Sequence, residues 1–93
     1  PMEELKMTNQ ILVVEDDKRL SQFIASELQL EGYEVTIADD GMDALEKVRE
    51  SPPDLIILDW MLPRISGLDV CLRLRKTGIK TTIILLTAKE VIL

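Results

Sequence analysis

Three short, uninterrupted apolar runs most constrain the fold of this chain. They cover residues 11–14, 55–58 and 83–86 and are rich in β-branched side chains. Runs of this length and composition are typical of strands buried on both faces of a parallel sheet. Residues 33–38 instead alternate apolar and polar side chains, which predicts a half-exposed strand at a sheet edge.

The segments between these strands have the spacing of amphipathic helices. After the first run, apolar residues follow an i, i+3, i+4, i+8 pattern at Leu20, Phe23, Ile24 and Leu28. Two further helices are predicted at residues 41–50 and 68–77, and prolines at 52 and 53 end the first of them. Regular alternation of strands and helices predicts an α/β fold, with a parallel sheet covered by helices on both faces.

The composition limits the classes of function that are open to the chain. Of the 93 residues, 46% are apolar and 30% charged, which is typical of one globular domain. The net charge of −6 argues against a chain that binds nucleic-acid phosphates by itself. Histidine is absent and Cys71 is the single cysteine, so an internal disulfide, a zinc site and Ser-His or Cys-His catalysis are excluded. No run is long enough to span a bilayer and residues 1–10 lack a secretory signal, so we expect a cytoplasmic protein.

Polar residues follow each of the three apolar runs. Glu15 and Asp16 follow the first run, Asp59 the second and Thr87 the third. Because the carboxyl ends of parallel strands meet at one edge of a sheet, we expect these side chains to converge. Clustered carboxylates repel one another unless a cation lies among them, and Mg²⁺ prefers such oxygen ligands. The pattern predicts an acidic Mg²⁺-binding pocket and leaves its reaction open.

Each candidate also has a purely structural interpretation. Asp17 is better explained as the N-cap of the following helix than as a ligand. Asp59 alone is compatible with a turn residue, Thr87 alone with an ordinary hydroxyl at a strand end, and Cys71 with core packing. A functional site is favoured by the combination, in which acids follow two buried runs and a hydroxyl follows a third.

Three motifs, in this order, resemble the receiver domain of bacterial two-component response regulators. They are ILVVEDD at residues 11–17, LDWMLP at 58–63 with SG at 66–67, and LLTAK at 85–89. The resemblance implies a flavodoxin-like, three-layer doubly wound parallel sheet with the family's strand order 2-1-3-4-5. Residues 1–9 are then an amino-terminal extension. Residues 10–93 are expected to be an incomplete receiver domain of order 2-1-3-4, which lacks the fifth strand, its lysine and the last helix.

The resemblance also implies a role for each candidate residue. Asp59 matches the aspartate that accepts a phosphoryl group from the phosphohistidine of a sensor histidine kinase. Asp16 matches the acid that binds Mg²⁺ directly, and Glu15 its acidic neighbour, which acts through bound water or as a ligand. Met61 matches the position whose backbone carbonyl completes the metal shell. Thr87 matches the hydroxyl residue that hydrogen-bonds the incoming phosphoryl oxygen.

Two alternatives to this interpretation stay open at this point. A small-molecule phosphatase with a strand-end aspartate generally has a second acid two residues later, where this chain has Met61. A receiver-shaped scaffold that dimerises without phosphotransfer is compatible with the absence of the fifth-strand lysine. The favoured interpretation remains a signalling module rather than an enzyme. Similarity around residues 61–71 to the branch fused to a winged-helix DNA-binding domain implies transcription control through an output domain outside these residues.

The sequence of the predicted fourth strand also indicates that the chain self-associates. Without a fifth strand, residues 81–87 form a sheet edge whose apolar run carries neither charge nor proline. Such an unprotected edge templates pairing with another chain. We therefore expect a homodimer formed through the fourth strand and the carboxyl-terminal segment.

Overall fold

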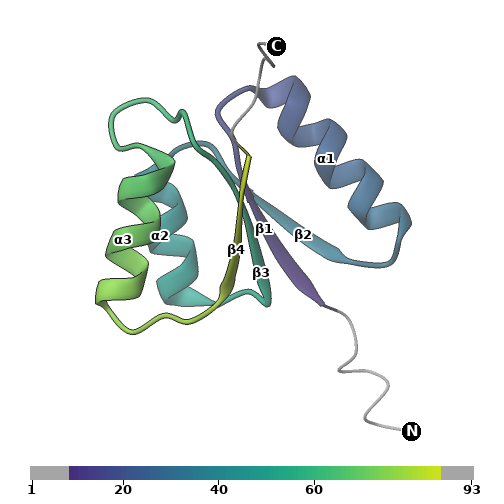
Figure 1. Cartoon of the computed structure of the whole chain (residues 1–93). Helices are drawn as coiled ribbons and strands as arrows, with labels where there is room; N and C mark the ends of the chain where they lie inside the picture. Colours follow the sequence, from purple (N-terminus) through teal and green to yellow (C-terminus); the bar gives the residue numbers. More distant parts are fainter. Residues whose placement is uncertain (1–8, 87–93) are drawn as a thin grey trace, which may run out of the picture.

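A four-stranded parallel sheet, covered by helices on both faces, organises the computed structural model, which describes residues 9–86 (Figure 1). Its elements, in chain order, are β1 (Gln10–Val14), α1 (Lys18–Leu30), β2 (Glu34–Ala38), α2 (Gly41–Glu50), β3 (Leu55–Asp59), α3 (Gly67–Lys76) and β4 (Thr82–Leu86). The strand order is β2-β1-β3-β4, so the predicted α/β fold and its order are confirmed. Thr87 and the predicted carboxyl-terminal segment lie outside the described residues.

The three helices begin at capping residues that hold their first turns. The Asp17 carboxylate accepts hydrogen bonds from the backbone amides of Arg19 and Leu20 at 3.0 and 3.3 Å, which confirms its predicted capping role. Asp40 and Ser66 cap α2 and α3 in the same way. These caps fix where each helix leaves the carboxyl end of the preceding strand.

The core lies mainly between the sheet and the α2–α3 layer. Its buried members come from β1 to β3, α2, α3 and the loop before α3: Leu12, Val14, Ala38, Ala44, Val48, Ile56, Leu58, Leu62, Val70 and Leu74. Cys71 is partly buried and packs against this cluster, in agreement with a core role. Burial of these apolar side chains is the main force that holds the sheet to its helices.

Strand β4 lies at an edge of the described sheet, as predicted for residues 81–87, and it is not buried on both faces. Ile84 is 48% exposed, whereas Ile83 and Leu85 pack against the core. The reason is that β4 lies at an edge of the described sheet, while α1 packs over β1 and β2 (Figure 1). The face of β4 that points to the α1 side therefore has no helix of residues 9–86 over it.

The prediction of which residues of α1 face the sheet is partly wrong. Phe23 is 62% exposed, and the fully buried positions of the helix are Ser21 and Ala25. At 3.6 residues per turn Phe23 lies about 160° around the helix from both Ser21 and Ala25, so it lies on nearly the opposite face. Small side chains at the centre of the contact allow the helix to approach the sheet closely.

Candidate metal centre

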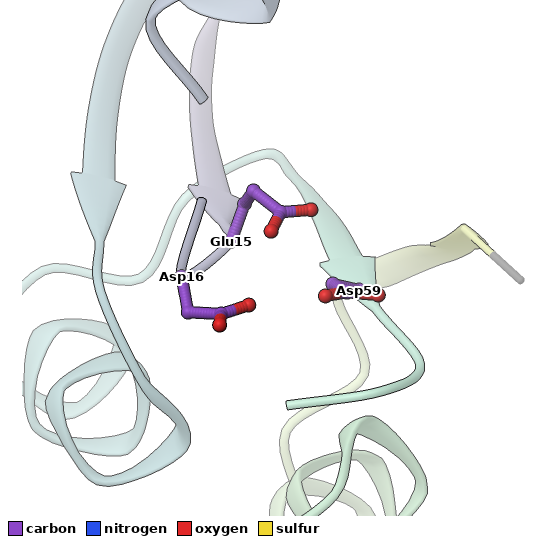
Figure 2. Close-up of side chains that lie close together, drawn as sticks. All are labelled: Glu15, Asp16 and Asp59. Carbon is purple, nitrogen blue, oxygen red and sulfur yellow. The ribbon is translucent and has the colours of Figure 1, made fainter. Parts of the chain in front are cut away.

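Three carboxylates converge at the carboxyl end of the central strands. Strands β1 and β3 are parallel neighbours, with Val14 opposite Leu58, so the next residues, Glu15 and Asp59, lie side by side. Asp16 follows at the start of the loop to α1, and Figure 2 shows the three side chains around a shared space. One carboxylate oxygen from each residue lies within 4.8 Å of the others. The structure thus brings together three of the residues that the sequence singled out.

Backbone amides orient the two buried carboxylates of this group. Glu15 and Asp59 are each 1% exposed, whereas Asp16 is exposed. The Glu15 carboxylate accepts a hydrogen bond from the Asp17 amide at 2.9 Å. The Asp59 carboxylate accepts one from the Met61 amide at 3.0 Å. Both acids are therefore held by the loop that follows their own strand.

The donor set of this cluster fits a hard divalent cation. All three side chains offer carboxylate oxygens, which Mg²⁺ prefers, and their mutual repulsion is relieved by a cation among them. Glu15, Asp16 and Asp59 are the residues that could hold it, with the Met61 backbone carbonyl as a further predicted ligand. Thr87, the predicted hydroxyl partner, lies outside the described residues.

The loop from Trp60 to Ser66 closes tightly over the end of β3. The Trp60 amide donates to the Leu86 carbonyl at 2.9 Å, and the Gly67 amide donates to the Trp60 carbonyl at 3.0 Å. A Cβ atom on Gly67 would meet the main-chain oxygen of Asp59 and, at 2.9 Å, the Cα atom of Trp60. Only glycine allows the first turn of α3 to approach the backbone of Asp59 this closely.

Gly67→Ala is therefore expected to destabilise the fold. Alanine favours a helix over glycine by up to about 1 kcal/mol, but here the added Cβ meets backbone atoms that cannot rotate away. We expect the clash to dominate and the free energy of unfolding to fall by about 1–3 kcal/mol. Urea unfolding measures this change. Leu72→Ala, at an exposed position of the same helix, is the control, and a Gly67→Ala variant as stable as that control would contradict the packing described here.

One ion pair near the site was not predicted from the sequence. Arg64, in the loop after β3, donates to the Asp40 carboxylate at 2.8 Å. The Asp43 amide, which donates to the same carboxylate at 2.8 Å, and then Arg64 itself hold the pKa of Asp40 below its usual value. The position of Asp40 before a helix could have indicated a cap, but no local pattern pairs residues 24 positions apart.

Two further structural facts bear on the class of protein. Within residues 9–86, no helix is both long enough and apolar enough to cross a bilayer. The described sheet, with its carboxylates at the carboxyl end of β1 and β3, follows the general placement of ligand sites in open α/β folds.

Comparison with protein families gives one match that covers most of the chain. The model described as "Response regulator receiver domain" matches residues 11–92. Among curated proteins, the chain is 43% identical over 84 residues to the response regulator MprA of Mycobacterium ulcerans. That alignment covers 90% of this chain and 36% of the relative, so the chain spans about a third of the relative's length.

Solved structures show the same fold. The receiver domain of the Francisella response regulator 1452 superposes with a TM-score of 0.85 at 36% identity, over 90% of this chain and 69% of the other. The response regulator TrrA of Thermotoga maritima, solved in complex with Mg²⁺-BeF, has a TM-score of 0.83 at 43% identity, over 89% and 72%. TrrA has also been solved in complex with the histidine kinase ThkA, and that structure superposes with a TM-score of 0.82 at 43% identity, over 90% and 72%.

Proposed function

Because the chain belongs to the response regulator receiver domain family, we propose that it is a phosphoacceptor module that takes a phosphoryl group from a sensor histidine kinase onto Asp59. The convergence of Glu15, Asp16 and Asp59 within 4.8 Å carries this proposal. It supplies a buried nucleophile beside a set of oxygen ligands that suits Mg²⁺.

In the proposed transfer, a carboxylate oxygen of Asp59 attacks the phosphorus atom of the phosphohistidine. An O–P bond forms, the N–P bond breaks, and the electron pair of that bond stays on the histidine nitrogen. The Met61 amide keeps the Asp59 carboxylate oriented through its 3.0 Å hydrogen bond. Bound Mg²⁺ would neutralise charge on the carboxylates and on the phosphoryl oxygens, which is what a loose phosphoryl-transfer transition state requires.

Residues around Asp59 complete the proposed site. Asp16 acts as a direct Mg²⁺ ligand, Glu15 as a ligand or through bound water, and the Met61 carbonyl as a further ligand. Thr87 supplies the hydroxyl for the phosphoryl oxygen. The complexes of TrrA with Mg²⁺-BeF and with a histidine kinase support the choice of metal and of partner for this chain.

A direct test of this function uses a small phosphodonor. We expect the protein, incubated with acetyl phosphate and Mg²⁺, to gain the mass of one phosphoryl group by intact mass spectrometry, and to gain none when EDTA removes the metal. A protein that binds Mg²⁺ but never gains this mass would favour the alternative function, a receiver-like scaffold that works by dimerisation without phosphotransfer.

The proposal also covers the division of the chain into domains, its location and the output that it controls. Residues 1–9 serve as an amino-terminal extension and residues 10–93 as the receiver portion of a longer cytoplasmic regulator. The similarity of residues 61–71 to regulators with a winged-helix output supports transcription control. In that arrangement a separate output domain binds DNA, in agreement with the net charge of −6 of this chain.

We further propose that the 93-residue polypeptide forms a homodimer through β4. In the described sheet, β4 pairs on one side only, with β3, and its exposed Ile84 adds apolar surface beside the unpaired backbone edge. At about 25 cal/mol per Å² of buried apolar area, covering a few hundred Å² contributes several kcal/mol to association.

Ile84→Lys tests this dimer without damage to the core. We expect sedimentation at micromolar concentration to show a dimer for the parent chain and a monomer for Ile84→Lys. Thr36→Lys, which adds the same charge at an exposed position of the opposite edge strand β2, is the control and should remain dimeric. A monomeric parent, or a dimer that Ile84→Lys does not disrupt, would contradict the proposed interface.

A further inference from the structure

An ion pair links the loop that follows Asp59 to the start of the neighbouring helix α2. The Arg64 guanidinium donates to one oxygen of the Asp40 carboxylate at 2.8 Å. The other carboxylate oxygen of Asp40 accepts the Asp43 amide at 2.8 Å and so caps α2. Asp40 thus joins the start of α2 and the loop after β3 through two separate hydrogen bonds.

The backbone of the loop is held in an unusual conformation at this point. Arg64 has a φ of +67° and is the one non-glycine residue of the described chain with a positive φ. The left-handed region is unfavourable for a residue with a Cβ atom, and such a conformation persists only where the surroundings impose it. The ion pair with Asp40 is one contact that imposes it.

A second contact of the loop lies directly beside the ion pair. Ile65 packs against Gly41, the first residue of α2, so closely that a Cβ atom on Gly41 would lie 2.5 Å from the Ile65 Cγ1 atom. Arg64 and Ile65 therefore both anchor the loop on the amino-terminal turn of α2. The loop is therefore held by contacts with the start of α2 as well as by its own hydrogen bonds.

The loop connects these anchors to the acidic cluster. Its other end carries Met61, whose amide donates to the Asp59 carboxylate at 3.0 Å, and the Gly67 amide closes it onto the Trp60 carbonyl. Loss of the Arg64 contact is expected to give the short segment between Met61 and Arg64 more freedom. The hydrogen bond from the Met61 amide to Asp59 should then weaken, because Met61 is part of this segment.

We propose that the Arg64–Asp40 pair is a positioning device that holds the Met61 backbone against Asp59 and thereby sets the affinity of the acidic site for Mg²⁺. Neither residue touches the metal, and both act through the loop. The inference rests on the proposed function only in its choice of Mg²⁺ as the ligand.

Arg64→Met tests the pair with little change in side-chain length. Arg64 is mostly exposed, so the variant is expected to fold. We expect its Mg²⁺ affinity to fall by about 2- to 5-fold, the range that exposed ion pairs reach. Arg64→Lys, which keeps the charge, should retain most of the parent affinity. Titration at constant ionic strength, followed by the fluorescence of the single tryptophan, Trp60, next to Asp59, measures this change.

A double-mutant cycle separates the pair from each residue alone. Asp40→Asn keeps a capping side chain for α2 but removes the charge. We expect Asp40→Asn to lose Mg²⁺ affinity as Arg64→Met does, and the double variant to lose little more, since both changes remove the same contact. Additive losses would show that the two residues act independently and would overturn the proposal.

Amide hydrogen exchange gives a readout that needs no metal. In Arg64→Met we expect the Met61 amide to exchange faster than in the parent, while the Asp43 amide, capped by Asp40, and the Val13 amide in the central strand keep their rates. Unchanged exchange at Met61 together with unchanged Mg²⁺ affinity overturns the inference. A parent that binds no Mg²⁺ would instead contradict the proposed function, and the exchange rate of Met61 would still decide whether the pair positions the loop.

Discussion

Asp59→Asn is expected to abolish phosphoryl labelling of the chain by acetyl phosphate. The amide of asparagine is a far poorer nucleophile than the carboxylate that it replaces. Its shape is nearly the same, so the side-chain oxygen can still accept the Met61 amide and the loop is expected to stay in place. Removing one of three clustered carboxylates also relieves repulsion in the absence of metal. We therefore expect no loss of thermal stability, and failure to label cannot be attributed to unfolding.

Intact mass after incubation with acetyl phosphate and Mg²⁺ measures the effect. Asp54→Asn is the matched control, because Asp54 precedes β3 at the opposite end of that strand and binds the Gln10 amide there. This control should gain the phosphoryl mass as the parent does. Labelling of Asp59→Asn at the parent level would move the acceptor to another acid, with Asp16 and Asp17 the next candidates.

The positions of the strands and of Glu15 and Asp59 could be predicted because local patterns determine them. Continuous β-branched runs indicate strands that are buried by helices on both sides. In a parallel sheet, residues that end neighbouring strands then lie at one edge. The register of Val14 against Leu58 places Glu15 and Asp59 side by side as that rule requires.

The features that were not predicted depend on contacts between distant segments. The exposure of Phe23 depends on how α1 is rotated on the sheet, and the apolar spacing of α1 is compatible with more than one rotation. The ion pair of Arg64 and Asp40 joins the loop after β3 to the residue before α2, two segments that lie far apart in the sequence. No residue type at positions 40 or 64 indicates such a contact.

Asp16→Ala is expected to weaken Mg²⁺ binding by about 100-fold or more. Loss of a partner that only orients a metal ligand typically lowers affinity by about 10- to 100-fold, so loss of a direct ligand should have at least that effect. Glu15 and Asp59 remain buried in the variant, whereas Asp16 is the exposed member of the cluster. The fold should therefore tolerate the change, and only the affinity for Mg²⁺ should fall.

Mg²⁺ titration followed by Trp60 fluorescence measures the affinity, and thermal unfolding gives an independent check. A ligand at about 100 times its dissociation constant stabilises a protein by about 2.7 kcal/mol. At the same concentration a site weakened 100-fold contributes only about 0.4 kcal/mol, so the rise in melting temperature that Mg²⁺ gives the parent should nearly disappear in Asp16→Ala.

Asp17→Ala is the matched control for this experiment, because it removes the same side chain one residue along. Asp17 caps α1 through Arg19 and Leu20, so its loss should lower the free energy of unfolding by about 1 kcal/mol. It should leave Mg²⁺ affinity nearly unchanged. Asp16→Ala is thus expected to lose Mg²⁺ affinity, whereas Asp17→Ala is expected to lose stability. Equal Mg²⁺ affinity in Asp16→Ala and the parent would show that Asp16 is not a ligand, and the metal would then have to be held by Glu15 and Asp59 with the backbone of the loop.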